Sequence, residues 1–249
     1  MQINCVISKF LIKLAVNLTI MATFKISDRL VRPCAIGSSV IYACLAALYF
    51  TQADIPGKTA LPLAFLTLVS LWMCPWKITV ALLSSALGDL AGEYGNLILQ
   101  MGSFVLTHIM FIWFLFERYR TKVERDGKLT EKAMGYTLLI GLLCIFIAGA
   151  AFTQIVMNTP AGIIRIGAGT YVLLICLMLG LALLQRSSLY ALGAVLFVCS
   201  DFILGWNMFT EPIENSKWLI MVPYYMGQWL IYIRSTSFRV APEMRLMRF

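Results

Sequence analysis

Apolar residues are gathered into long runs that are separated by short polar breaks along most of the chain. A helix needs about 20 mostly apolar residues to cross the hydrocarbon core of a bilayer, which is about 30 Å thick. Eight runs come close enough to this length to predict membrane-spanning helices. They cover residues 34–50, 60–75, 77–95, 97–116, 133–153, 162–184, 189–207 and 217–234. The pattern therefore predicts an all-α, polytopic integral membrane protein, with eight transmembrane helices in one bundle over residues 34–235.

The two ends of the chain differ from this eight-helix region. Residues 1–33 contain the apolar stretch Leu14–Phe24, which is too short to span a bilayer and lacks an evident small-residue cleavage site. This stretch is compatible with an interfacial amphipathic segment, or with a translation start at Met21. We expect residues 1–33 to form a cytoplasmic or interfacial segment that does not span, and residues 236–249 to form a basic C-terminal tail.

Composition agrees with lipid as the solvent. The chain has 249 residues, of which 60% are hydrophobic and only 13% are charged, and its mean hydropathy is +0.84. Soluble domains are closer to half apolar and a quarter charged. The net charge of +8 does not indicate a nucleic-acid partner, because the basic residues lie in the gaps between apolar runs and form no face on a polar domain.

The distribution of Lys and Arg predicts the orientation. Cytoplasmic loops of membrane proteins carry an excess of these residues. With the N-terminus inside, 17 of the 20 lie on the cytoplasmic side, and only Lys58, Arg165 and Lys217 lie outside. An odd number of helices would move the arginines of the C-terminal tail across the membrane and weaken this asymmetry. We therefore expect both termini to be cytoplasmic and place the protein in the bacterial inner (cytoplasmic) membrane.

Two aspartates lie inside apolar runs, where a charged side chain is costly unless it faces the bundle interior, a partner or water. Asp89 and Asp201 each stand 12 residues into a helix that runs outward. At about 1.5 Å per residue, both lie roughly 18 Å along their helices, in the outer half of the bilayer. Two carboxylates at matching depth could share one cavity. The alternative is that each is a structural polar group bonded to a neighbouring helix.

Five other polar residues are candidates for substrate binding, and each also has an ordinary structural interpretation. Glu93 follows Asp89 by four residues on the same helix face but could be an interfacial acid. A lone histidine in an apolar helix is usually a hydrogen-bonded core group, and tyrosine and arginine often anchor a helix at the membrane interface. The candidates are Glu93, His108, Arg165, Tyr224 and Gln228. Gly88 and Gly92 bracket Asp89 and would let a neighbouring helix approach closely.

Several kinds of chemistry have no support in the sequence. There is no GxSxG, HExxH, Walker A or dinucleotide-binding GxGxxG pattern. His108 is the only histidine, and no two of the seven cysteines lie within nine residues of each other, so neither a multi-histidine metal site nor a Cys-based one is expected. We expect no metal and no cofactor. The sequence does not indicate an oligomeric state.

Two blocks of sequence follow one another along the predicted helices. The first block is Ser85-Ala86-Leu87-Gly88-Asp89, then Met101-Gly102-Ser103-Phe104 and Thr107-His108. The second block runs from Leu192 to Asp201 and continues with Tyr224-Tyr225-x-x-Gln228. Together they resemble the signatures of the YhhN-like lysoplasmalogenase family, and the likeness covers roughly residues 36–235. The family tends to have Lys just before a Pro in the second helix, where this chain has Leu61-Pro62.

The resemblance implies an eight-helix membrane hydrolase that cleaves the vinyl-ether bond of lysoplasmalogens to a fatty aldehyde and glycerophosphoethanolamine or glycerophosphocholine. It also implies catalytic roles for Asp89 and Asp201. The chemistry is compatible with two carboxyl groups, since one can protonate the alkene while the other stabilises the oxocarbenium ion and activates water. Either residue could take either role. The partners implied are the lysophospholipid substrate and membrane lipids.

Two other classes of function compete with the hydrolase. The first is a transporter for a small solute or for protons, in which the aspartate pair forms a relay. The second is a non-catalytic membrane protein that binds lipid or partners. A hydrolase needs a dead-end cavity open to lipid on the outer side, whereas a transporter needs access from both sides. The position of both aspartates in the outer half favours the hydrolase.

Overall fold

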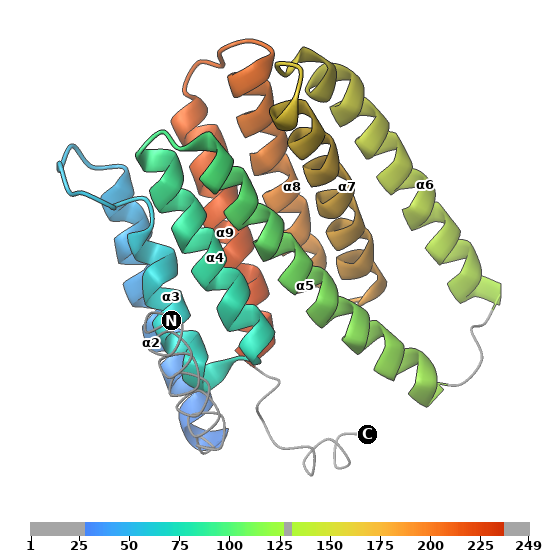
Figure 1. Cartoon of the computed structure of the whole chain (residues 1–249). Helices are drawn as coiled ribbons and strands as arrows, with labels where there is room; N and C mark the ends of the chain where they lie inside the picture. Colours follow the sequence, from blue (N-terminus) through green and yellow to red (C-terminus); the bar gives the residue numbers. More distant parts are fainter. Residues whose placement is uncertain (1–27, 127–130, 237–249) are drawn as a thin grey trace, which may run out of the picture.

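The computed structural model describes residues 28–126 and 131–236, with side chains for residues 30–124 and 134–236. These residues form eight α-helices and one short 3₁₀ helix, and no strand occurs among them (Figure 1). The fold class is therefore all-α. The helices are α2 (Asp28–Tyr49), α3 (Leu61–Met73), α4 (Trp76–Glu93), α5 (Leu97–Asp126), α6 (Glu131–Gln154), η1 (Val156–Asn158), α7 (Ile163–Leu184), α8 (Ser188–Phe209) and α9 (Ser216–Thr236).

Each of the eight predicted runs overlaps one of these α-helices, including the short pair that is separated only by Cys74 and Pro75. The boundaries differ most at α2, which begins at Asp28, and at α5, which continues to Asp126. Helix α5 extends beyond its apolar run because pairs of charged residues four positions apart stabilise it there. Arg120 and Glu124 form one such pair. Residues 1–27 and 237–249 of the predicted terminal segments lie outside the described residues.

Five helical segments are long and apolar enough to cross a membrane, by length and composition. Helix α3 is apolar but shorter, and α4 and α9 contain many polar residues that face the interior of the bundle. Exposed leucine and phenylalanine side chains cover the outside of the bundle, as expected for a surface in contact with lipid. The eight-span topology with both termini cytoplasmic stays a prediction. The five segments are Leu30–Tyr49, Leu97–Glu124, Met134–Asn158, Ile163–Leu184 and Ser188–Phe209.

Seven helices surround the interior, and α6 lies outside them (Figure 1). Helices α2, α3, α4 and α5 pack in sequence order, α5 then packs on α7, and α7 on α8. Helix α9 closes the arrangement because it contacts α8 as well as α2, α3 and α4. Helix α6 packs on α7 and on η1. A chain of short connections thus brings α4, α5, α8 and α9 around a common interior.

The two ends of the bundle carry different charges. We call the end with the α2–α3, α4–α5 and α8–α9 loops the cavity end, and the other the basic end (Figure 1). Of the ten Lys and Arg residues whose side chains are described, Lys58, Arg165 and Lys217 belong to the cavity end. The acids Asp54, Glu93, Glu211 and Glu214 also belong there. The remaining basic residues belong to the basic end, namely Arg32, Lys77, Arg118, Arg120, Lys122, Arg186 and Arg234.

Candidate active site

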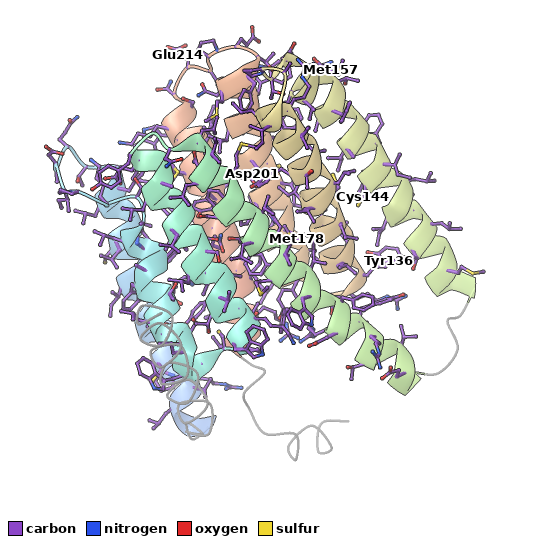
Figure 2. The ribbon with its side chains drawn as sticks, viewed as in Figure 1. Tyr136, Cys144, Met157, Met178, Asp201 and Glu214 are labelled. Atoms are coloured by element: carbon purple, nitrogen blue, oxygen red, sulfur yellow. The ribbon has the colours of Figure 1, made fainter. Side chains whose placement is uncertain are left out.

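A polar cavity of about 190 Å³ opens toward the cavity end of the bundle, among α2, α4, α5, α8 and α9. Asp89 and Asp201 both line it, so the two carboxylates that the sequence places at matching depth share one cavity. Figure 2 shows Asp201 inside the bundle, nearer to the end that carries Glu214 than to the end near Tyr136. The other lining residues are Tyr49, Thr59, Gly92, Glu93, Gln100, Phe104, Ser200, Leu204, Ile220, Met221 and Tyr224.

Asp89 is held in the last turns of α4 and is only 5% exposed. The hydroxyl of Tyr224, on α9, donates a hydrogen bond to Asp89 Oδ2 over 3.0 Å. The two glycines that bracket Asp89 let α5 pack closely, as the sequence predicts. A Cβ on Gly88 would lie 3.0 Å from the ring of Phe104, and one on Gly92 would lie 2.5 Å from the amide of Gln100.

Asp201 has a different set of partners. The Tyr171 hydroxyl, on α7, donates to Asp201 Oδ2 over 2.6 Å, and His108 Nε2, on α5, lies 3.5 Å from the same oxygen. His108 Nε2 also lies 3.1 Å from the Tyr171 oxygen. Because Tyr171 has one proton and gives it to Asp201, His108 donates Nε2–H to Tyr171 in this arrangement. Three side chains from α5, α7 and α8 therefore form a hydrogen-bonded chain that ends at Asp201.

His108 lies behind the cavity rather than in its wall. Its side chain is fully buried, and its ring packs edge-on against Phe197 and Tyr171. Nδ1 has no hydrogen-bond partner among the described residues, which fits a neutral ring whose proton is on Nε2. The position allows His108 to orient Tyr171 and Asp201 but does not bring it to the cavity surface.

Glu93 stands at the mouth of the cavity, where its carboxylate holds the α2–α3 loop. Glu93 Oε1 accepts the backbone N–H of Gly57 over 2.6 Å, and Oε2 accepts the N–H and the hydroxyl of Thr59 over 3.2 and 2.7 Å. The sequence predicts correctly that Glu93 shares a face with Asp89, since both line the cavity. Its observed bonds tie the loop to α4 and form one rim of the opening.

Gln228 and Arg165 do not line the cavity in this structure. Gln228 is fully buried on α9, one turn beyond Tyr224, and its amide donates to Ser85 Oγ over 2.8 Å. Ser85 is paired with Thr107 of α5 over 3.1 Å. The Arg165 guanidinium donates to the carbonyl oxygens of Thr159 and Met157, at the turn between α6 and α7. A phosphate-binding role for Arg165 stays a prediction.

The structure also places at the site residues that the sequence does not predict, chiefly Tyr171. It lies eight residues into α7, roughly 12 Å from the start of that helix, which is a depth similar to that of the aspartates. A tyrosine so far inside an apolar helix is a usable signal, because its hydroxyl needs a partner there. Gln100, near the start of α5, and Thr59, in the α2–α3 loop, also line the cavity. Polar residues are common at helix starts and in loops, so the sequence does not mark these two as site residues.

An apolar groove adjoins the polar cavity and is formed by α5, α6, α7 and α8. The groove and the cavity have Gln100, Phe104, Asp201 and Leu204 in common. Its other lining residues are apolar except for Tyr171, which carries the hydroxyl bonded to Asp201. Asp201 therefore stands where a polar space and an apolar space meet. Among the described residues, no three His, Cys, Asp or Glu side chains gather in a group suited to a metal ion.

Comparison with known proteins places this arrangement in a family. The family model of the YhhN family matches residues 57–235, which include every helix that lines the cavity except α2. The chain belongs to the YhhN family. This confirms the resemblance that the two sequence blocks indicate. The match begins in the α2–α3 loop and ends in α9.

Curated relatives of this YhhN-family chain include two mammalian proteins named lysoplasmalogenase TMEM86B. The protein from Sus scrofa is 28% identical over 170 residues, which cover 68% of this chain and 66% of the relative. The protein from Homo sapiens is 27% identical over 154 residues, or 61% and 59%. Lysoplasmalogenase TMEM86A from Bos taurus is 26% identical over 180 residues. The chain spans less than two thirds of the first two relatives, and no solved structure matches it.

Proposed function

We propose that this protein is a membrane-embedded hydrolase that cleaves the vinyl-ether bond of lysoplasmalogens. The products would be a fatty aldehyde and glycerophosphoethanolamine or glycerophosphocholine. The observation that carries the proposal is the pair of aspartates, Asp89 and Asp201, in one cavity beside an apolar groove. The names of the curated relatives point to the same reaction.

The reaction requires two duties that a pair of carboxyl groups can divide. A protonated carboxyl group delivers a proton to the alkene carbon that does not bear the oxygen, and an oxocarbenium ion forms at the other alkene carbon. An ionised carboxylate stabilises this cation and removes a proton from the water that attacks it. The resulting hemiacetal breaks its bond to the glycerol oxygen, giving the aldehyde and the free alcohol. Glycosidases divide acid and base duties between carboxyl groups in the same way.

The polarity of the two spaces fits the shape of a lysoplasmalogen. This lipid has a phosphate headgroup at one end and a hydrocarbon chain at the other, and the vinyl ether lies between them. The polar cavity would hold the glycerophosphate part and the groove would hold the chain. The bond to be cleaved then falls near Asp201, which lines both spaces.

The packing beneath the carboxylates favours a hydrolase over a transporter. Phe197, one turn below Asp201 on α8, is fully buried, and so is Leu82, two turns below Asp89 on α4. Phe111, one turn below His108 on α5, is 1% exposed. These side chains belong to the continuous core that fills the bundle toward the basic end. Gln228, Ser85 and Thr107 are buried at the same level, but none of the three carries a charge. A relay across the membrane would need a polar path that continues through the whole of this layer.

The proposal is tested by aldehyde release from lysoplasmenylethanolamine, measured with the purified full chain. Asp89→Asn and Asp201→Asn keep the size of each side chain but remove its acid–base function. We expect each variant to lose at least about 100-fold in kcat, which is a usual contribution of general acid–base catalysis. Asp54→Asn is the matched control, because Asp54 is an exposed aspartate in the α2–α3 loop.

Thermal unfolding of each variant separates lost chemistry from lost folding. The proposal is wrong if folded wild-type protein releases no aldehyde, or if both cavity variants keep full activity. A transporter would instead show aspartate-dependent uptake of a solute or protons into proteoliposomes, without aldehyde release.

A further inference from the structure

We infer that Lys217 binds the phosphate of the lysolipid at the mouth of the polar cavity, and that it thereby makes the enzyme prefer substrates that carry a phosphate. This inference rests on the proposed function, because it names the residue that recognises the charged part of the substrate. Lys217 is the second residue of α9 and lies at the cavity end. Figure 2 labels Glu214, three residues earlier, at that end of the bundle.

Two observations place Lys217 at the cavity mouth. On α9 it precedes Met221 by four residues and Tyr224 by seven, and both of these line the cavity. Residues with this spacing share one face of a helix. Lys217 Nζ also lies 4.6 Å from the centroid of the Tyr49 ring, and Tyr49 lines the cavity from the end of α2. The ammonium group therefore stands at the rim, between α9 and α2.

The positive charge of Lys217 is open to an incoming anion. Its side chain is exposed, and no carboxylate with a described side chain lies within ion-pair distance of Nζ. The other two cations of the cavity end are bonded to backbone carbonyls. Lys58 Nζ donates to one in its own loop over 2.8 Å, and Arg165 donates to two at the α6–α7 turn. Lys217 is therefore better placed than Arg165 to bind the phosphate of a substrate in the cavity.

A phosphate in this part of the molecule needs a cation, because the cavity contains carboxyl groups. Asp89, Asp201 and Glu93 all line it. An ionised carboxylate repels a phosphate anion, and the repulsion is stronger where little water screens it. A cation at the rim offsets this repulsion and holds the phosphate on the side away from the aspartates. The first turn of α9 adds to the effect, since the backbone N–H groups at a helix start favour an anion.

Hydrogen bonds show how far Lys217 lies from the aspartates. On α9, Tyr224 donates to Asp89. The Ile220 carbonyl, on the same helix, accepts the hydroxyl of Ser200, which precedes the other aspartate. Ile220 and Tyr224 follow Lys217 by three and seven positions, or about 5 and 10 Å along the helix. Lys217 therefore stands one to two turns above the two aspartates.

This separation fits the length of the substrate. Five covalent bonds separate the ether oxygen of a lysoplasmalogen from its phosphorus, and they span about 6 Å when extended. A phosphate oxygen and its hydrogen bond to an ammonium group add about 4 Å. A substrate whose vinyl ether is level with the aspartates can therefore reach the ammonium group of Lys217 with its phosphate.

The next residue places Lys217 at the depth of lipid headgroups. The Trp218 ring stacks on Phe50, with the ring centroids 3.9 Å apart, and Trp218 is 53% exposed. Tryptophan is enriched at the membrane–water interface, where its ring lies at the headgroup level. A lysolipid bound by Lys217 thus keeps its phosphate near the depth that it has in a bilayer leaflet, while its ether oxygen reaches the aspartates.

The experiment compares a substrate that carries a phosphate with one that lacks it, namely lysoplasmenylethanolamine and a 1-alkenylglycerol of the same chain. Lys217→Gln removes the charge, and we expect the ratio of kcat/KM for the phospholipid to that for the alkenylglycerol to fall by about tenfold. The fall should come mainly from KM, because the phosphate lies away from the reacting bond. Lys217→Arg keeps the charge and should restore most of the ratio. Lys122→Gln is the matched control, because Lys122 belongs to the basic end.

A second readout separates this inference from the proposed function. Alkyl-ether analogues of the two lipids are not vinyl ethers, so their binding can be followed by the rise in Tm without any hydrolysis. If wild type cleaves nothing but Lys217→Gln selectively loses stabilisation by the phosphate-bearing ether, the assignment of Lys217 holds and the hydrolase proposal fails. If wild type cleaves the substrate and the ratio is unchanged in folded Lys217→Gln, the assignment is wrong.

Three other results would also overturn the assignment. An equal loss of kcat/KM on both substrates would mean that Lys217 only anchors α9 at the membrane interface. A rise in Tm with inorganic phosphate as large as that with the phosphate-bearing ether would mean that the rim binds a free anion rather than the substrate. An equal fall of the ratio in Lys122→Gln would mean that the net charge of the protein, and not the position of Lys217, decides the preference.

Discussion

At the scale of single residues, the two aspartates differ in the support they receive. Asp89 accepts one hydrogen bond, from Tyr224, over 3.0 Å. Asp201 accepts a shorter one, from Tyr171, and His108 stands behind that hydroxyl. Hydrogen bonds to a charged group are worth about 1.5–3 kcal/mol. Both tyrosines are therefore positioning residues for the proposed reaction, although neither need touch the reacting atoms.

We predict that Tyr171→Phe lowers kcat by about 10- to 100-fold with little change in KM, because a bond of 1.5–3 kcal/mol to the carboxylate is lost while the walls of both spaces keep their shape. Steady-state kinetics of aldehyde release measure the two constants. Tyr232→Phe is the control, since the Tyr232 hydroxyl is also buried and bonded, to Ser38 and Met73, but lies outside the cavity. A similar loss in both variants would mean that Tyr171 acts only through stability.

The sequence predicts some of these residues and not others, for physical reasons. Asp89 and Asp201 can be found because a carboxylate within an apolar run needs a special environment. Tyr171 gives a weaker signal, its depth within an apolar helix, because tyrosine is frequent both at membrane interfaces and in interiors. The bonds of Glu93 to the α2–α3 loop join residues more than 30 positions apart, and the bonds of Arg165 depend on the shape of one turn. Neither kind of contact has a local sequence signal.

At the scale of the helices, α8 and α9 approach each other closely below the site, two turns before Asp201 on α8 and about one turn after Tyr224 on α9. A Cβ on Gly227 would lie 2.8 Å from the carbonyl oxygen of Gly193, and one on Gly193 would lie 3.0 Å from the carbonyl oxygen of Gly227. The two backbones approach each other because neither glycine has a side chain. This crossing fixes the position of α9 relative to α8, and therefore of Tyr224 relative to Asp201.

We predict that Gly227→Ala destabilises the protein by about 1–3 kcal/mol, which is the usual cost of overpacking, because a backbone oxygen cannot move aside as a flexible side chain can. Thermal unfolding in detergent, followed by circular dichroism, measures the change. Gly141→Ala is the matched control, since a Cβ at Gly141 on α6 meets nothing within 4 Å. An unchanged Tm in Gly227→Ala would show that α8 and α9 can separate without cost.

Helix positions follow from the sequence better than helix ends do. The apolar runs locate all eight α-helices, because each run reflects the part of a helix that is surrounded by lipid or by other helices. They miss the ends of α2 and α5, because a helix can continue into water when charged neighbours support it. Hydropathy also undervalues α4 and α9, since their buried polar residues serve the interior of the bundle.

At the scale of the whole molecule, the charges divide the bundle into two ends. Seven of the ten described Lys and Arg side chains belong to the basic end, and the three others to the cavity end. The positive-inside tendency of membrane proteins then predicts that the cavity opens away from the cytoplasm. The substrate would enter the cavity from the outer leaflet or from the aqueous space next to it.

We predict that a fluorescent protein fused to the C-terminus folds and fluoresces in a bacterial host, because that terminus is expected in the cytoplasm. Alkaline phosphatase inserted after Glu214, in the α8–α9 loop, should be active because that loop is expected on the periplasmic side. The reciprocal fusions, with the reporters exchanged, serve as controls and should be inactive. The opposite pattern would place the cavity on the cytoplasmic side and reverse the orientation.

The shared wall at Asp201 has a consequence for the fate of the products. In the proposed reaction the cut falls at the boundary between the polar cavity and the apolar groove, so the two fragments are left in different surroundings. The aldehyde can pass sideways into the bilayer, whereas the glycerophosphate fragment can diffuse into water. Once one fragment is in lipid and the other is in water they rarely meet again, so partitioning of the products would oppose the reverse reaction.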